Sequence, residues 1–391
     1  MKVAFFSNFH QPCGIADYSA QLLDELAKLV DVKIVQSPLP SQTAYKYSSY
    51  IHYAKKFRQC AMELNKADIC HIQHDYSFWG GVKPSRNLFP YMASAIRVPV
   101  VLTSHEILNQ QFKMADFKGA MKWLSFCLSP FSRRYSVYVS PGLHQWADKT
   151  IVHTVQHMDM LVKQGVSPDR VMVIPHGIPP CRLLNLETGI VKSRWGLAGN
   201  RVLMIVGFIS SRKGYELVLN ILQFLPDDVK LVIAGGCRTD SEKIYLSGLL
   251  ESIARLGVSQ RVVITGYLEA VDLHALVQVS DIILAPFKTV AGSGTLSIAF
   301  ALGRPVIASD LAPMLELNKS AKSMLLFAAG DSKDLLAKIK LLLSSEQLSA
   351  EMSSTALRYA AVNSMQTIAE QTAALYEQVL MERSKDSVKI P

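Results

Sequence analysis

The stretch from 286 to 310, PFKTVAGSGTLSIAFALGRPVIASD, constrains the fold of this chain more than any other. It follows an apolar run over 281–285, which closes with a proline as buried parallel strands often do. The turn Gly292-Ser293-Gly294 leads into a helical run over 295–302, and Gly303 ends that helix before a second apolar strand. A strand, a glycine turn, a helix and a further strand in this order are typical of a doubly wound α/β domain.

The glycine turn at 292–294 allows two interpretations. At the start of a helix, free backbone N–H groups and the positive end of the helix dipole can bind a phosphate as the chain leaves the carboxyl end of a strand. The same turn can also serve packing alone, because glycine-rich strand-to-helix turns are common. Taken alone, the turn does not decide between a phosphate site and a tight turn.

Length and composition favour two folded domains. The chain has 391 residues, 49% of them hydrophobic and 19% charged, which excludes a disordered protein and allows two separate cores. No apolar run reaches transmembrane length, and the N-terminus enters a strand without the pattern of a signal peptide. Six cysteines without a Cys-x-x-Cys pair indicate reduced thiols. We therefore expect a cytoplasmic enzyme.

The net charge of +9 favours an anionic partner. A phosphorylated ligand and an anionic membrane surface rank before nucleic acid, because no nucleic-acid-binding motif accompanies the charge. The segment Phe112–Arg134 combines basic and aromatic residues, as an amphipathic helix at a membrane does. An ordinary surface helix packed on the core explains the same pattern and is the more common case.

The order of apolar runs predicts two α/β domains of similar size. One doubly wound pattern begins with a strand at 2–7, and a second begins with a strand at 201–207. A polar, glycine-containing segment separates them. The expected organisation is a first domain over 1–185, a linker over 186–200, a second domain over 201–365 and a C-terminal helix over 366–391.

Polar residues and a glycine follow the predicted strands of the first domain. Gly14 lies in the first crossover loop, His74 and Asp75 follow the third strand, and His105 follows the fourth. In an open parallel sheet the ligand lies at the carboxyl ends of the strands. Gly14, His74 and His105 are therefore expected to face one crevice.

The histidine pairs do not indicate a metal site. His153 and His157 are four residues apart, but the glutamate of a zinc protease and a third ligand are missing. His71 and His74 are three apart on a predicted strand, where side chains alternate between opposite faces. The sequence also lacks a P-loop, a nucleophile elbow and the dinucleotide fingerprint. No bound metal is expected.

The segment Gly207–Gly214, GFISSRKG, leaves the first strand of the second domain and carries Arg212 and Lys213. Two cations beside a glycine can neutralise a diphosphate, or they can be ordinary solvated loop residues. The segment and the 292–294 turn are expected at the same edge of one sheet, which favours a bound nucleotide diphosphate.

A series of motifs resembles glycosyltransferase family four, retaining enzymes of the GT-B type with two Rossmann-like domains facing a cleft. The motifs follow the family's order over nearly the whole chain: CGIADY (13–18), HIQHDYSFWGG (71–81), VVLTSHE (100–106), VIPHGI (173–178), GFISSRKG (207–214), ITGYLEAVDL (264–273) and GSGTLSIAFALGRPVIASD (292–310). The resemblance implies transfer of a sugar from a nucleotide-diphosphate sugar to an acceptor hydroxyl. It implies no cofactor and no metal, since the nucleotide sugar is the substrate.

The resemblance also assigns roles to single residues. His105 matches an active-site histidine that contacts the transferred sugar, and Lys213 matches the lysine that binds the diphosphate, with Arg212 beside it. The N-terminal domain would hold the acceptor, with His74 and Asp75 on that side, and the last helix would cross back onto it. The other donor contacts match Gly14, Gly207, Gly266, Tyr267, Leu268, Gly292, Ser293, Gly294, Thr295 and Leu296.

Two features depart from the family pattern. Its two glutamates eight apart align with Val290 and Ile298, and its arginine after the strand glycine aligns with Phe208, although Arg212 could supply that charge. The missing first glutamate removes a usual contact to the donor sugar. Donor identity therefore stays open, and to a lesser degree so does activity.

The resulting expectation is a metal-independent, hexosyltransferase-like enzyme of polysaccharide or lipid-linked glycan synthesis. Its acceptor would be a saccharide or lipid-linked saccharide, met in the cytoplasm or at the inner face of an anionic membrane. Two alternatives stay open. One is a non-catalytic glycosyltransferase-like binding or regulatory protein, and the other is a nucleotide-sugar epimerase on the same scaffold.

Overall fold

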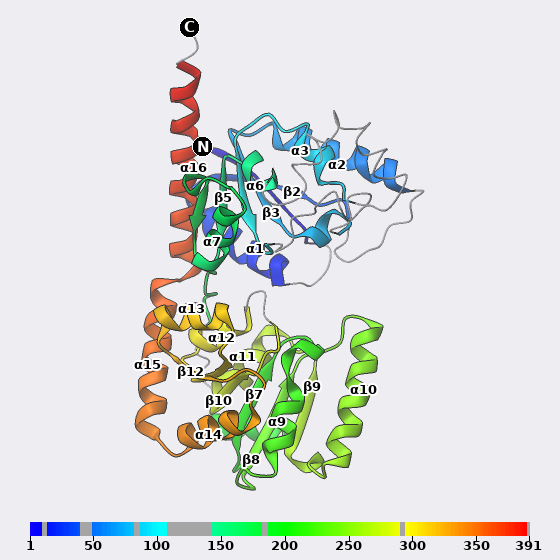
Figure 1. Ribbon diagram of the computed structural model, residues 1–391, viewed down its shortest axis with the longest axis vertical. Coiled ribbons are helices and arrows are strands. Elements are labelled where there is room, and N and C mark those ends of the chain that lie inside the picture. The colour runs from blue at the N-terminus through cyan, green and yellow to red at the C-terminus, as the bar shows by residue number, and fades with distance from the viewer. Residues whose placement is uncertain are drawn as a thin grey trace. The chain divides into compact units, whose positions relative to one another are not determined.

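The computed structural model describes residues 1–9, 14–39, 49–81, 87–107, 142–181, 187–289 and 294–388. They form two compact units: unit 1 is Met1–Gly177 with Met365–Pro391, and unit 2 is Ile178–Ser364. Each unit contains one six-stranded sheet in which every neighbouring pair of strands is parallel (Figure 1).

The sheet of unit 1 has the strand order β2-β1-β3-β4-β5-β6. Its strands are β1 (Lys2–Ser7), β2 (Asp31–Gln36), β3 (Ile69–His74), β4 (Val100–Ser104), β5 (Lys149–Val152) and β6 (Val171–Val173). Its helices are α1 (Gly14–Leu26), α2 (Tyr50–Leu64), α3 (Phe89–Ala93), α6 (Gly142–Trp146), α7 (Val155–Lys163) and α16 (Met365–Val388).

Strand β1 shows why this sheet is covered on both faces. Val3 to Phe6 are all fully buried, because successive side chains point to opposite faces and each face carries helices. Val3 and Phe5 join a cluster with α1 and α16, whereas Ala4 and Phe6 join a cluster with α2, α3 and α6.

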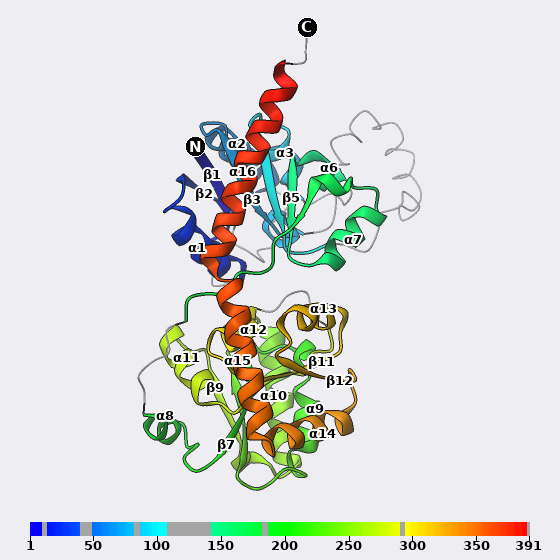
Figure 2. The same ribbon diagram turned by 90° about the vertical axis from the view of Figure 1, so that its left-hand side faces the viewer.

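The C-terminal helix α16 is part of unit 1. It packs beside α1 and crosses the first sheet (Figure 2). Tyr376 is fully buried, and its hydroxyl lies 2.5 Å from Nδ1 of His71 on β3. Arg383 adds an ion pair of 2.7 Å with Asp148.

The sheet of unit 2 has the order β12-β11-β10-β7-β8-β9. Its strands are β7 (Arg201–Val206), β8 (Val229–Ala234), β9 (Val262–Gly266), β10 (Ile282–Ala285), β11 (Val306–Ser309) and β12 (Met324–Phe327). Its helices are α8 (Thr188–Arg194), α9 (Tyr215–Leu222), α10 (Asp240–Arg255), α11 (Ala270–Val279), α12 (Gly294–Ala301), α13 (Ala312–Ala321), α14 (Ser332–Leu343) and α15 (Glu346–Val362).

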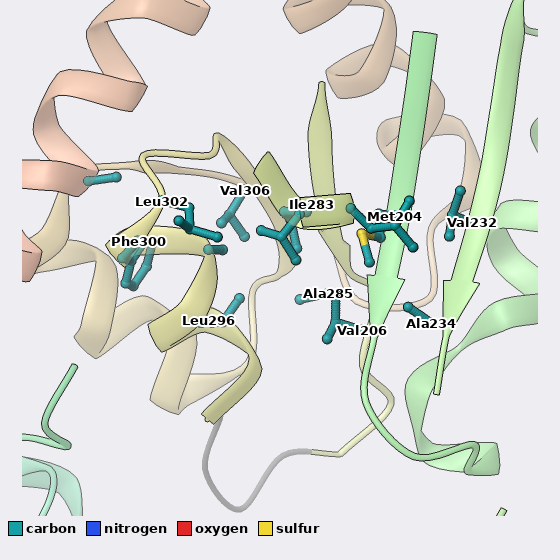
Figure 3. Packing of buried hydrophobic residues seen from close by; sticks show 14 of the residues in the cluster. Met204, Val206, Val232, Ala234, Ile283, Ala285, Leu296, Phe300, Leu302 and Val306 are labelled. Carbon is teal, nitrogen blue, oxygen red and sulfur yellow. The ribbon is translucent and has the colours of Figure 1, made fainter. Parts of the chain in front are cut away.

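Helix α12 packs on one face of this second sheet. Its Leu296 and Phe300, with Leu302 just beyond its end, share a buried cluster with Val206 of β7 and Ala285 of β10 (Figure 3). Helices α9, α10 and α14 cover the opposite face. Leu296, in the first turn of α12, shares this cluster with Val206 and Ala285, the last residues of β7 and β10, so the first turn of α12 lies at the carboxyl ends of these strands.

The boundary between the units differs from the expected one. It falls after Gly177, and the segment expected as a linker belongs to unit 2, where Val191 of α8 and Leu197 are buried in the core. The sequence did not indicate that Val191 and Leu197 are core residues, because polar residues and glycines surround them. Strand β5 ends at Val152, because Thr154 caps α7 by accepting a hydrogen bond from the backbone of His157.

None of the described helices has the length and apolar character needed to cross a membrane. The basic, aromatic segment Phe112–Arg134 lies outside the described residues.

Candidate functional site

The backbone after β7 is pressed tightly against the backbone after β8. Gly207 has a φ of +102°, and a Cβ on Gly235 would lie 2.3 Å from the Gly207 carbonyl oxygen. Two hydrogen bonds join the segments, from Gly207 N to Ala234 O at 2.8 Å and from Ile209 N to Gly236 O at 3.0 Å. These contacts require glycine and hold the two strand ends together.

A tight turn follows and presents Arg212 and Lys213. It begins at Ser210, whose hydroxyl accepts a hydrogen bond from Arg212 N at 3.4 Å. It ends at Gly214, with a φ of +69°, where a Cβ would lie 2.0 Å from the carbonyl oxygen of Pro286. Only glycine fits at this position, so the turn is fixed against the carboxyl end of β10.

Lys213 folds back onto the edge of the sheet. Its Nζ donates a hydrogen bond of 2.5 Å to the carbonyl oxygen of Val206 and lies 5.3 Å from the centre of the Phe287 ring. Burial, followed by repulsion from Arg212 and Arg238, lowers the pKa of Lys213 to about 8. A partly desolvated ammonium group of this kind gains from an anionic partner.

Arg238, in the loop after β8, is a cation that the sequence did not single out. Its guanidinium carbon lies 4.4 Å from the centre of the Phe208 ring, and Nη2 donates to Oε1 of Glu242 at 3.1 Å. The side chain of Arg238 is 30% exposed. The position of Arg238 beside this edge follows from the register of β7 and β8, which pairs Val206 with Ala234. A motif read along the chain does not contain this pairing.

The loop after β9 adds an exposed aromatic ring. Strand β9 ends at Gly266 with a φ of +71°, and Tyr267 is 60% exposed. The rings of Tyr267 and Phe208 stack with centres 6.3 Å apart and planes inclined by 21°. Leu268 packs against the core of unit 2.

The structure describes only part of the glycine turn at 292–294. Gly292 and Ser293 lie outside the described residues, as does Val290. Gly294 and Thr295 begin α12, and Leu296 is buried against the sheet. Ile298, the second position aligned with a family glutamate, is half-buried and packs on the core.

His105 follows β4 in unit 1 and is held by a side chain of β3. Its Nε2 donates a hydrogen bond of 2.6 Å to Oε1 of Gln73, and Nε2 of Gln73 donates to His71 at 3.2 Å. Burial, followed by repulsion from His153 and other histidines, holds the pKa of His105 well below its usual value. The ring is therefore a neutral hydrogen-bonding group at neutral pH.

Two other candidates of unit 1, His74 and Asp75, have local structural roles. His74 is 1% exposed and packs among the rings of Tyr76, Trp79 and Phe89. Oδ1 of Asp75 accepts a hydrogen bond of 2.8 Å from Ser77 N and caps a short 3₁₀ turn. Gly14 is exposed at the start of α1 with open space around it. The side chain of His74 therefore does not line the expected crevice, because it is packed in the core of unit 1.

Within the described ranges, no group of three or more His, Cys, Asp or Glu side chains is arranged to hold a metal ion. Lys213, Arg212, Phe208 and Arg238 instead form a cationic and aromatic edge around the Gly207 turn of unit 2. Such an edge suits an anion attached to a planar ring.

Two family models match the chain. The one described as Glycosyltransferase Family 4 matches residues 12–182, and the one described as Glycosyl transferases group 1 matches residues 192–358. The first match covers most of unit 1 before Gly177, and the second lies within unit 2.

Curated relatives match parts of their own length. Mannosylfructose-phosphate synthase of Agrobacterium fabrum is 21% identical over 254 residues, which cover 62% of this chain and 54% of that protein. MMP α-(1→4)-mannosyltransferase of Mycolicibacterium hassiacum is 25% identical over 290 residues, which cover 72% of this chain and 66% of that protein. The chain thus spans between about half and two thirds of the length of these relatives.

A solved structure matches nearly the whole chain. Anabaena Alr3699/HepE in complex with UDP has a TM-score of 0.73 and 18% identity, covering 97% of this chain and 100% of that chain. At this identity the likeness concerns the fold, and it confirms the predicted GT-B class with two parallel α/β sheets. The two family matches, which together span most of the chain, show that it belongs to glycosyltransferase family four.

Proposed function

We propose that this chain transfers a sugar from a nucleotide-diphosphate sugar to an acceptor hydroxyl, with retention of the anomeric configuration. The observation that carries the proposal is the clustering of Lys213, Arg212 and Arg238 around the glycine-locked end of β7. Membership of glycosyltransferase family four supports it. Sugar transfer needs such charges, because the departing diphosphate becomes more negative in the transition state.

In this proposal the diphosphate lies against Lys213 and the cations beside it. Lys213 is partly buried and would exchange its bond to the Val206 carbonyl for a phosphate oxygen, while Arg212 and Arg238 neutralise the remaining charge. The N-terminus of α12, fixed next to β10, would add backbone N–H groups. No metal ion is required for this charge balance.

A uridine nucleotide is the first donor to test. HepE of Anabaena, which shares the fold, has been crystallised with UDP and with UDP-glucose. The exposed ring of Tyr267, stacked on Phe208, offers a surface on which a base can lie. The backbone of Gly266 to Leu268 would read the edge of that base.

The reaction would break the bond between the sugar's anomeric carbon and the phosphate oxygen. The acceptor oxygen would form the new bond on the same face, and its proton would pass to the departing phosphate oxygen. His105 is neutral and fixed by Gln73, so we assign it to holding the sugar. Because its pKa lies well below the usual value, His105 carries no proton to donate as a charged acid at neutral pH.

The acceptor would be a saccharide or lipid-linked saccharide, in polysaccharide or lipid-linked glycan synthesis in the cytoplasm. The net charge of +9 supports additional contact with an anionic membrane. Binding to vesicles containing phosphatidylglycerol at low salt tests this point. Failure to bind them under those conditions would remove the membrane contact and leave the transferase assignment intact.

The transferase assignment is tested by incubating the full chain with UDP-glucose, UDP-galactose, GDP-mannose and ADP-glucose, each with and without saccharide acceptors. We expect one donor to release its nucleoside diphosphate, faster with acceptor, and EDTA to leave the rate unchanged. Lys213→Met should lower the rate at least tenfold, whereas Lys340→Met on the exposed face of α14 should not change it.

The same assay separates the alternatives. Conversion of the donor sugar without release of diphosphate would indicate an epimerase. Binding of a nucleotide sugar without turnover under any acceptor would indicate a non-catalytic relative.

A further inference from the structure

Three histidines lie at the carboxyl edge of the first sheet, each after a different strand. His105 follows β4, His153 follows β5 and His176 lies just beyond β6. The ring of Tyr18, from the first turns of α1, contacts all three, with centre distances of 5.5, 5.5 and 4.7 Å. The centres of His105 and His153 are 5.2 Å apart, and those of His153 and His176 are 5.3 Å apart. We call His105, His153 and His176 the histidine cluster.

Each ring in the histidine cluster has one nitrogen fixed as a donor. Nδ1 of His153 donates to the carbonyl oxygen of Ile174 at 3.0 Å, and Nδ1 of His176 donates to the carbonyl oxygen of Gly177 at 3.1 Å. Nε2 of His105 donates to Oε1 of Gln73 at 2.6 Å. A carbonyl or amide oxygen can only accept, so these partners determine the tautomer of each ring.

The second nitrogen of each ring must then be an acceptor. Burial is the main cause that lowers the pKa of all three, to about 3 for His153, so the rings are neutral near pH 7. Nε2 of His153 is buried and, among the described residues, has no hydrogen-bond partner. Leaving a buried acceptor unpaired is costly, so a hydroxyl group that donates to this nitrogen would be stabilised there.

The chemistry of the cluster selects the kind of ligand. Three unprotonated nitrogens would repel phosphate oxygens, and the described residues offer no arrangement that could hold a metal ion. A neutral ligand with several hydroxyl groups fits, because each hydroxyl can donate to one nitrogen. A sugar has this chemistry.

We propose that the histidine cluster binds a sugar by accepting hydrogen bonds from its hydroxyl groups, with Tyr18 holding the three rings in place. This inference rests on the proposed sugar transfer for the identity of the ligand and extends the sugar contact from His105 to His153 and His176. The sugar can come from the donor or from the acceptor, and the two sources make different predictions.

Nuclear magnetic resonance of the ring nitrogens tests the cluster without any ligand. We expect Nδ1–H tautomers for His153 and His176 and an Nε2–H tautomer for His105, unchanged between pH 6.5 and 8. An imidazolium ring or the opposite tautomers at His153 and His176 would overturn the inference.

Calorimetry with UDP, UDP-glucose and methyl glucoside then identifies the source of the sugar. His153→Phe and His176→Phe keep an aromatic ring but remove the acceptor, and His52→Phe on exposed α2 is the matched control. Loss of affinity for UDP-glucose but not UDP, by roughly three- to tenfold, would identify the donor sugar. The same loss for methyl glucoside alone would identify the acceptor sugar.

Two results would count against the cluster. Folded His153→Phe and His176→Phe proteins that keep wild-type affinity for both sugars would overturn the inference while UDP binding still supports the proposed function. Wild-type protein that binds UDP but neither sugar would overturn it as well. Absence of any nucleoside diphosphate binding would instead remove the proposed function. The thermal midpoints of the variants show whether each one is folded.

Discussion

The environment of Lys213 destabilises its protonated form unless an anion is bound nearby. Burial, followed by repulsion from Arg212 and Arg238, lowers its pKa to about 8, and its Nζ donates a hydrogen bond to the Val206 carbonyl oxygen. A bound diphosphate reverses this balance, because it supplies the opposite charge that the site lacks. The protonated form therefore binds the anion better than the neutral form.

This titration predicts the pH dependence of nucleotide binding. The affinity for the nucleoside diphosphate should fall as the pH rises through about 8, because Lys213 loses its proton there. Calorimetry between pH 6.5 and 9.5 measures it, with Lys340→Met as the control for a lost surface lysine. Persistence of the same fall in the Lys213→Met variant would assign it to another group.

Arg238 gives a second prediction at the residue scale. Its guanidinium lies over Phe208 and makes one bond to Glu242, so most of its donors are available to a phosphate. Arg238→Ala should lower UDP affinity about tenfold and leave uridine affinity unchanged. Arg255→Ala, an exposed cation at the other end of α10, is the control. Equal losses for UDP and uridine would indicate a structural role.

At the scale of elements, the turn that presents these cations depends on Gly214. A Cβ there would meet the Pro286 carbonyl oxygen at 2.0 Å, and the φ of +69° is strained for other residues. Gly214→Ala should lower the free energy of unfolding by at least about 2 kcal/mol. Gly248→Ala, on the exposed face of α10 with open space around it, should raise it by about 0.5–1 kcal/mol. Urea unfolding measures both, and shifts in the same direction would contradict this account.

The elements themselves were largely predictable because parallel strands buried on both faces are continuous apolar runs. The strand expected at 201–207 and the helix expected at 295–302 lie close to the observed β7 and α12, and Lys213 was found from its place after β7. Arg238 was missed because its approach to Phe208 depends on the pairing of two strands. His153 was set aside as half of a chance pair, since its neighbours His105 and His176 come from other strand ends.

At the scale of the whole molecule, buried histidines couple folding to pH. His71, His74 and His144 are at most 1% exposed, and burial, the main cause in each case, lowers their pKa values to about 3. The unfolded chain binds protons near pH 6.5 and the folded chain does not. Stability is therefore complete above about pH 7 and is lost as the pH falls below 6.5.

Urea unfolding at pH 7.5, 7, 6 and 5 tests this coupling. We expect little change between pH 7.5 and 7, and then a decline of up to about 1.4 kcal/mol per pH unit for each buried histidine. Acidic groups such as Glu63, whose pKa is lowered to about 2 by hydrogen bonds from Lys33 and Lys66, act only at lower pH. A free energy of unfolding that stays level down to pH 5 would contradict the assignment of neutral, buried rings.

We propose above all that the carboxyl edge of the second sheet binds the diphosphate of a nucleotide sugar. A crystal structure of the full chain with UDP tests it most directly. We predict that phosphate oxygens lie within hydrogen-bond distance of Lys213 Nζ and the Arg238 guanidinium, with the base next to Tyr267. A diphosphate bound away from both cations would contradict the claim.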